Sequence, residues 1–294
     1  MVFSLGSLYA QQMPLFSSYN TNKMLLSPST TGMDQLISTS LISRLQFAGF
    51  EGAPITNLLL AELGKEESPS GLGLIMYNDR IGVVSNLGVQ LNYGYRLKLS
   101  KDMNIGFGLG LAFDQWNYDQ RRISVDEVDD PQLYNTRENS STIRGDIGAH
   151  LDYKNLFVSL AVPKVFATDI SYNNPLTSEE VSIQQLRHIM GYVSYDIHTK
   201  SEKYVITPAA LVRIADEFDP QIDANLTVGY QEKFFGMVGY RVGYAATLGA
   251  GMQFNRRVRG GYNYDFPING TTQYGTGSHE LMLKIRLGKI LDNN

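Results

Sequence analysis

Strict alternation between apolar and polar side chains, repeated along most of the chain, is the feature that most narrows its fold. In residues 221–230, every even-numbered position from Ile222 to Tyr230 is apolar or aromatic, whereas the odd-numbered positions carry Gln, Asp, Asn, Thr and Gly. Side chains of a β-strand point to opposite faces in turn, so this segment has one apolar and one polar face. The same pattern recurs at 87–98 and 143–153. It predicts an all-β fold.

The polar faces of these strands are charged, which separates two kinds of β protein. Residues 87–98 carry Arg96 and Lys98 on that face, and residues 143–153 carry Arg144, Asp146 and Asp152. A soluble β-sandwich is the alternative, but its apolar faces would need a second sheet to cover them. A charged face suits the wet lumen of a barrel whose outer face meets lipid. The pattern therefore favours a transmembrane antiparallel β-barrel.

Fourteen segments have the alternation expected of barrel strands. Most are close to the 9–11 residues that cross a bilayer at a tilt, and their even number is typical of bacterial barrels. The weakest are 203–215, which contains Pro208, and 233–241. The predicted strands are 35–47, 53–64, 70–79, 84–98, 102–115, 143–153, 155–163, 187–199, 203–215, 219–231, 233–241, 245–254, 256–265 and 279–287.

The connections between these segments give an independent check on the count. If both termini are periplasmic, the odd-numbered connections are extracellular, and they include the long segments 116–142, 164–186 and 266–278. The even-numbered connections include tight turns such as Tyr153-Lys154-Asn155. Short periplasmic turns and longer extracellular loops are typical of outer-membrane barrels, so the count agrees with the loop lengths.

Composition agrees with a barrel and excludes other classes. The net charge of −4 gives no basic surface for nucleic acid, and the absence of Cys excludes disulfides and thiolate chemistry. Charged residues make up 18 %, below the usual quarter of a soluble protein. The 18 Tyr suit aromatic girdles at the membrane interfaces, and the 28 Gly suit tight turns and crowded positions in the lumen.

The chain divides into four parts. We expect a signal-peptide remnant at 1–10, an irregular periplasmic leader at 11–34, the barrel at 35–288 and a short tail at 289–294. Two states of the lumen remain open. Either ion pairs or the folded-back leader close it, or it is a water-filled pore.

Short motifs in a fixed order run through the chain from the leader to the last predicted strand. They are Gln11-Gln12-x-Pro14-x-Phe16-Ser17-x-Tyr19-x-x-Asn22, Arg44-x-Gln46-Phe47-x-Gly49-Phe50-x-Gly52-Ala53-Pro54-x-Thr56, Gly71-Leu72-Gly73, Asp79, Ile81-Gly82, Gly261-Tyr262-x-Tyr264-Asp265 and Gly277-Ser278-His279-Glu280-Leu281-Met282-Leu283. Their order and spacing resemble the PorP/SprF family of Bacteroidota outer-membrane proteins, over about residues 11–287.

This resemblance implies a component of type IX secretion in the bacterial outer membrane. Members of the family are similar to barrels that hold secreted adhesins or enzymes at the cell surface through the cargo's C-terminal domain, and some link to the periplasmic ring of the secretion and gliding machinery. The implied partners are therefore cargo, ring components and outer-membrane lipid, with no nucleic acid and no cofactor. A passive or substrate-specific porin is the alternative function.

Aromatic side chains in the long connections are the candidates for binding a partner outside the cell. Aromatic residues anchor many protein interfaces, and the acidic run Asp126-Glu127-x-Asp129-Asp130 lies beside three of these candidates. For Trp116, a place in the outer aromatic girdle is equally compatible with the sequence. The candidates are Trp116, Tyr118, Tyr134, Tyr172 and Tyr274. On the periplasmic side, the candidates are Pro14, Phe16, Tyr19, Asn22, Arg256 and Arg257. For Arg256 and Arg257, a solvated turn without a partner is the alternative, and the sequence favours it.

Enzyme chemistry finds little support. The four His residues are scattered without metal-ligand spacing, and Gly106-x-Gly108-x-Gly110 opens no helix, so it is not a dinucleotide loop. Ser278 and His279 are neighbours, and neighbouring strand residues face opposite ways, so they cannot readily form a nucleophile–base pair. We expect no catalytic, cofactor or metal site.

Overall fold

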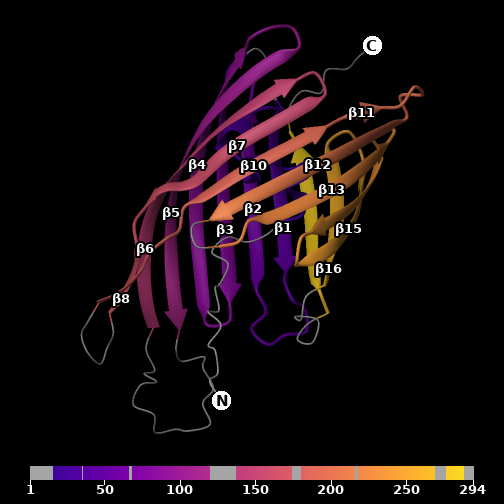
Figure 1. Ribbon diagram of the computed structural model, residues 1–294. Helices are drawn as coiled ribbons and strands as arrows, with labels where there is room; N and C mark the ends of the chain where they lie inside the picture. Colours follow the sequence, from indigo (N-terminus) through magenta and orange to yellow (C-terminus); the bar gives the residue numbers. More distant parts are fainter. Residues whose placement is uncertain are drawn as a thin grey trace.

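Fourteen antiparallel strands close into a barrel in the computed structural model, which describes residues 16–34, 36–65, 68–119, 137–173, 180–215, 218–268 and 276–287 (Figure 1). Among these residues, no helix has the length and apolarity to cross a membrane. The barrel strands are β1 (Ile37–Leu45), β2 (Ile55–Gly64), β3 (Ser70–Ile81), β4 (Val84–Lys98), β5 (Met103–Asp119), β6 (Arg137–Tyr153), β7 (Leu156–Ala167), β10 (His188–Tyr195) with its continuation β11 (Ile197–His198), β12 (Tyr204–Ala215), β13 (Gln221–Tyr230), β14 (Phe234–Arg241), β15 (Ala245–Gln253), β16 (Val258–Pro267) and β17 (Ser278–Arg286). All fourteen predicted strands are confirmed.

Each strand pairs with its neighbours along the chain, and β1 pairs with β17 to close the sheet. The closing register runs from Ser38 opposite Arg286 to Leu45 opposite His279. The weakly predicted strand β12 continues through Pro208, which lies opposite Leu226 of β13. Closure leaves this sheet without an open edge. An open edge is not tolerated in hydrocarbon, because its unpaired backbone groups would find no hydrogen-bond partner there.

The two ends of the barrel differ in their connections. At one end, here the short-turn end, strands join through 65–69, 99–102, 154–155, 199–203, 231–233 and 254–257. The opposite end, here the long-loop end, carries the connections 120–136, 168–187 and 268–277. By the usual asymmetry of these barrels, the short-turn end is periplasmic and the long-loop end is extracellular.

Two of the predicted long loops are shorter than the sequence indicated. Strand β5 continues to Asp119 and pairs with β6 from Arg137 onward, so strands occupy both ends of the predicted loop 116–142. Within 164–186, β7 extends to Ala167, and β8 (Ile170–Asn173) pairs with β9 (Glu180–Ile183) in a separate hairpin (lower left in Figure 1). Strand pairing outside the lipid needs no apolar face, so alternation does not mark these extensions.

Alternation along each strand separates a lipid-facing surface from the lumen. Outward side chains are apolar and exposed, among them Leu91 and Leu109 at 61 %. Inward side chains include buried charges, namely Arg44, Arg144, Asp146, Asp223, Asp265 and Lys284. Near the short-turn end, exposed Tyr153, Tyr195, Tyr204 and Phe234 have the character of an interfacial aromatic girdle.

Replacing Leu91 by Arg should test which face meets lipid. Leu91 lies at the middle of β4, where an Arg in hydrocarbon costs about 2–4 kcal/mol, and Leu97→Arg near the strand end should cost about 0–1 kcal/mol. Urea titrations of the barrel folded in phospholipid vesicles measure both variants. Equal losses at the two positions would contradict a lipid-facing outer surface.

Candidate functional site: the occupied lumen

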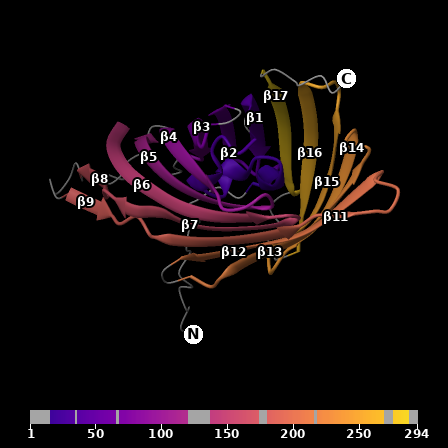
Figure 2. The same ribbon diagram turned by 90° about the horizontal axis from the view of Figure 1, so that it is seen from above.

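The N-terminal segment 16–34, here the lumen segment, lies inside the barrel. It forms three short 3-10 turns, η1 (Ser18–Asn20), η2 (Lys23–Leu25) and η3 (Pro28–Thr30). The side chains of Tyr19, Asn22 and 26–31 are buried, and η3 contacts β4, β5 and β6 (Figure 2, from above, shows the indigo turns within the ring of strands). The leader was predicted as irregular and periplasmic, and its described part, residues 16–34, lies in the lumen.

The lumen segment runs along the barrel axis in a defined direction. Near its start, the Ser17 amide donates to Glu280, close to the long-loop end of β17. Near its end, the Met33 carbonyl accepts from Arg96, and Asp34 pairs with Lys284 at 3.2 Å, both close to the short-turn end. The segment thus begins in the long-loop half and enters β1 from the short-turn end.

A row of glycines makes room for the backbone of the lumen segment. Gly71, Gly94, Gly108 and Gly148 lie opposite one another on β3, β4, β5 and β6. A Cβ at Gly108 would overlap the backbone of Pro28 and Ser29, and one at Gly71 or Gly94 would overlap the Thr31 carbonyl. Here we call these four residues the glycine row. Glycine lets η3 and the residues after it lie directly on the barrel wall.

Six charges, five of them buried and Arg213 partly buried, form one network across the lumen. Arg44 pairs with Asp265 at 2.6 Å and with Glu280 at 3.2 Å. Arg241 joins Asp265 to Asp223, which also pairs with Arg213 at 2.7 Å. Three Arg face three acids, so the network is balanced in formal charge. Such buried pairs are sensitive, because removing one partner leaves an uncompensated charge and costs about 3–5 kcal/mol.

This charge network holds the start of the lumen segment. Both oxygens of Glu280, which is fully buried, accept from the Ser17 amide, and the Ser18 amide donates to Oε1 at 2.7 Å. The Ser17 hydroxyl donates to Asp265 at 3.2 Å. Backbone amides thereby complete the hydrogen bonds of a carboxylate that has no access to water.

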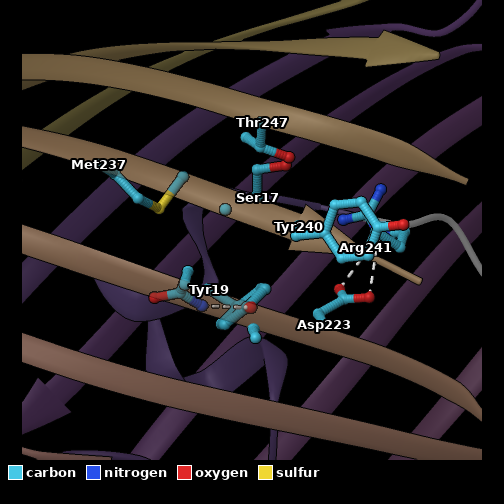
Figure 3. A pocket seen from close by; sticks show the side chains of 10 residues that line it. Ser17, Tyr19, Asp223, Met237, Tyr240, Arg241 and Thr247 are labelled. Carbon is cyan, nitrogen blue, oxygen red and sulfur yellow. Dashed lines mark hydrogen bonds and ion pairs between the residues drawn. The ribbon is translucent and has the colours of Figure 1, made fainter. Parts of the chain in front are cut away.

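Tyr19 and Asn20 extend these contacts to the strands on the other side of the lumen. The amide of Asn225 donates to the Tyr19 hydroxyl at 2.7 Å, and Asp223 with Arg241 lies beside it (Figure 3). Asn20 bridges Asn225 and the hydroxyl of Tyr192.

Next along the segment, Lys23 lies over the ring of Phe157, with its Nζ 3.8 Å from the ring centroid. The aromatic contact supplies part of what the ammonium loses in hydration.

A second charge cluster lies in the long-loop half, beside a cavity of about 150 Å³. Arg144 pairs with Asp114 at 3.1 Å and with Asp146 at 2.8 Å, and it donates to Gln90. The floor of the cavity includes Leu25 and Leu26 of the lumen segment, and Trp116 lies in its wall. We call this space the lumen cavity.

The predicted extracellular residues are placed differently from one another. Trp116 and Tyr118 belong to paired strand β5 rather than to a loop, and Trp116 lines the lumen cavity, so it belongs neither to an outer girdle nor to a free loop. Strand β5 stays paired beyond the alternating stretch, so both residues lie on a strand and not in a loop. Tyr172 lies on β8, and its side chain is outside the described residues, as are Tyr134, Tyr274 and the acidic run at 126–130.

The predicted periplasmic residues also lie in different places. Phe16, Tyr19 and Asn22 lie in the lumen and do not face the periplasm, because the charge network and two apolar clusters hold the segment inside. Arg256 and Arg257 are exposed in the β15–β16 connection at the short-turn end. Pro14 lies outside the described residues.

No reactive constellation is present among the described residues. Ser278 accepts a hydrogen bond from the Phe47 amide, and His279 contacts the hydroxyl of Tyr262. His150 binds Ser29 of the lumen segment at 3.1 Å. Within the same ranges, no three His, Cys, Asp or Glu side chains come close enough to hold a metal ion.

Sequence reasoning missed the residues that hold the lumen segment. Glu280 and the glycine row appeared only as parts of family motifs or as strand residues. The sequence did place charges of opposite sign on the inward faces of the strands. The segment that binds Glu280 and Asp265, however, lies more than 200 residues away in the chain.

Comparison with known proteins identifies the family. The family model described as "Type IX secretion system membrane protein PorP/SprF" matches residues 8–285. No curated protein sequence matches the chain.

Solved structures of similar fold include channels and transporters. The monoaromatic hydrocarbon channel CymD has a TM-score of 0.55 at 12 % identity, covering 94 % of each chain. The toluene transporter TbuX of Ralstonia pickettii has a TM-score of 0.55 at 9 % identity, covering 91 % of this chain and 93 % of its own. The toluene transporter TodX of P. putida has 0.51 at 11 %, covering 92 % and 95 %. At these identities the likeness concerns the fold alone.

Glu280→Ala should release the start of the lumen segment, because it removes the acceptor of the Ser17 and Ser18 amides. The native chain has no Cys, and the Ser18 hydroxyl has no partner, so Ser18→Cys supplies a clean probe. We expect maleimide to label this probe at least tenfold faster with Glu280→Ala, and Glu51→Ala, at an exposed acid, should leave the rate unchanged. Equal protection in both backgrounds would refute the role given to Glu280.

Gly108→Ala should destabilise the barrel by about 1–3 kcal/mol, because the new methyl group overlaps the backbone of η3. Gly191→Ala is the matched control, since a Cβ at this strand glycine meets no atom within 4 Å. Urea unfolding in vesicles compares the two. A similar effect at both positions would mean that the glycine row does not seat the lumen segment.

Proposed function

Because the chain belongs to the PorP/SprF family of type IX secretion system membrane proteins, we propose that it is a non-catalytic component that holds or helps to export a cargo protein through the cargo's C-terminal domain. A role in type IX secretion and an outer-membrane location follow from the family and the barrel fold. Family and fold are those of secretion components and channels rather than of a known enzyme class.

The occupied lumen is the observation that carries this proposal. The lumen segment is held by backbone bonds to Glu280, by the glycine row and by two apolar clusters. A passive porin needs a continuous water path, and a segment anchored along the barrel axis obstructs one. Binding of partners at the two ends of the barrel is therefore favoured over diffusion of solutes through it.

The long-loop end is the side proposed for cargo. Strands β5 and β6 are each 17 residues long, more than a bilayer crossing needs, and the β8–β9 hairpin is a further paired element there. Paired strands give a more rigid binding surface than a single unpaired loop of equal length.

The short-turn end is the side proposed for the periplasmic machinery. Among the described residues of this end, the exposed basic side chains are Lys65, Lys98, Lys101, Lys154, Lys200, Lys203, Lys233, Arg256 and Arg257, whereas the exposed acids of its connections are Asp102, Glu202 and Glu232. Glu66 and Glu67 of the 65–69 connection lie outside the described residues. The excess of positive charge favours a partner with an acidic surface, by electrostatic complementarity.

A pull-down of the tagged protein in mild detergent, followed by mass spectrometry, tests the proposal. We expect a large secreted protein, periplasmic ring components or both. Charge reversal by Arg256→Glu with Arg257→Glu should reduce the recovery of ring components severalfold and leave the cargo unchanged. Arg187→Glu, at an exposed residue near the long-loop end, is the control.

Recovery of the intact barrel alone, in repeated experiments, would reject the anchoring function. Steady ion conductance of the same preparation in planar bilayers would then establish the porin alternative. An obstructed lumen predicts no such conductance.

A further inference from the structure

The lumen cavity lies on the side of the barrel where cargo is proposed to bind. It is lined by Thr56 near the start of β2, Asp79 near the end of β3 and Trp116 near the end of β5, all toward the long-loop end. Its other walls are mostly apolar, with Leu58, Ile75 and Met190 among them. An apolar cavity with a few polar groups is the usual form of a ligand site.

Three polar atoms of this wall are buried without a hydrogen-bond partner. They are Nε1 of Trp116, Oδ1 of Asn86 and Oε1 of Gln185. Gln185 is oriented by its own amide nitrogen, which donates to the Thr168 carbonyl at 2.9 Å and leaves Oε1 as the free acceptor. An unsatisfied buried polar atom costs about 1–3 kcal/mol, so three around one cavity indicate that something else completes them.

A β-bulge adds a fourth polar group to the cavity. The β6–β7 register shifts between Gly145 and Ile147, and Lys164 takes a φ of 55° opposite this shift. Its amide donates to Asp146 at 2.9 Å, and its side chain, only 6 % exposed, lines the cavity. The carboxylates of Asp114 and Asp146 pair with Arg144, and the Lys164 ammonium forms no ion pair among the described residues. Bulges commonly redirect a side chain toward a functional site.

These groups define what a ligand must offer. Trp116 and Lys164 donate, so the ligand needs an acceptor, whereas the free oxygens of Gln185 and Asn86 need a donor. The acids Asp79, Asp114 and Asp146 disfavour an anionic ligand, because only Arg144 and Lys164 oppose them in the wall. A neutral peptide group offers both a carbonyl acceptor and an N–H donor, and an apolar side chain suits the remaining wall.

The size of the cavity agrees with one side chain. A cavity of about 150 Å³ can hold a molecule the size of benzene. It is too small for a folded element, and it fits a single Leu or Phe side chain with its adjoining peptide group.

We propose that the lumen cavity binds one large apolar side chain and the neighbouring peptide group of an extended polypeptide segment that enters from the long-loop end. The peptide chemistry follows from the cavity itself, and the identity of the partner as exported cargo rests on the proposed function. The lumen segment then has a second role, because Leu25 and Leu26 form the floor of the binding site.

The cavity can be observed directly, because Trp116 is the only Trp in the chain. N-acetyl-leucinamide carries one apolar side chain between two amide groups and serves as the probe. Titrated into the detergent-solubilised barrel, it should change the Trp116 fluorescence in a saturable way. N-acetyl-glycinamide, which lacks the side chain, should bind at least tenfold more weakly. No saturable change, or equal binding of both probes, would overturn the proposal and leave the cavity to water.

Variants of the wall separate specific binding from unfolding. Ala161→Leu fills part of the cavity with apolar volume, and Gln185→Ala removes one free acceptor; each should weaken the probe at least tenfold. Gln184→Ala, at the exposed neighbour of Gln185, should leave binding unchanged. Gel mobility of heated and unheated samples shows whether each variant still forms the barrel. Unchanged binding in both folded cavity variants would exclude the lumen cavity as the site.

Failure of this inference can be told from failure of the proposed function. Cargo recovered in the pull-down at the wild-type level from Ala161→Leu cells would keep the anchoring function and reject the cavity as its contact. Saturable probe binding without any cargo in the pull-down would keep the peptide site and reject the anchoring function.

Discussion

The requirement that every backbone amide in a membrane finds a partner within the protein governs this structure. The β1–β17 pairing meets it by closing the sheet, so that no strand edge faces lipid. Closure also creates an interior, which the alternation of side chains makes polar and charged. Charges in that interior need partners of their own, and the Arg44, Asp265 and Glu280 contacts provide them. The lumen segment completes this arrangement by supplying backbone donors to Glu280.

Shape and charge act together in holding the lumen segment. The glycine row gives the backbone of η3 a surface without side chains, so van der Waals contact is close along residues 28–32. The charge network fixes the start of the segment, and the ion pair between Lys284 and Asp34 fixes its end. A segment held at both ends and along its middle behaves as part of the wall. For this reason the lumen cavity has a defined floor.

The sequence predicted the barrel well because its signal is local. Alternation with period two is set by lipid on one side and water on the other, and it marked all fourteen strands, including β12 with Pro208. The alternation failed as a guide where the strands leave the lipid and both of their faces meet water. Trp116 and Tyr118 lie on a part of β5 that continues toward the long-loop end, where pairing no longer needs an apolar outer face. The site itself was beyond such reasoning, because the contacts of Ser17 and Tyr19 depend on strands near the other end of the chain.

The contact between Ser17 and Glu280 spans 263 positions, which ties the first described turn of the chain to its last strand. A chain that stops before β17 lacks the partner of β1 and also the carboxylate that receives the lumen segment. Closing the barrel and holding the start of the lumen segment therefore depend on the same strand, β17. Contacts of such long sequence separation carry a loop-closure entropy that the β1–β17 pairing and the Glu280 bonds must both overcome.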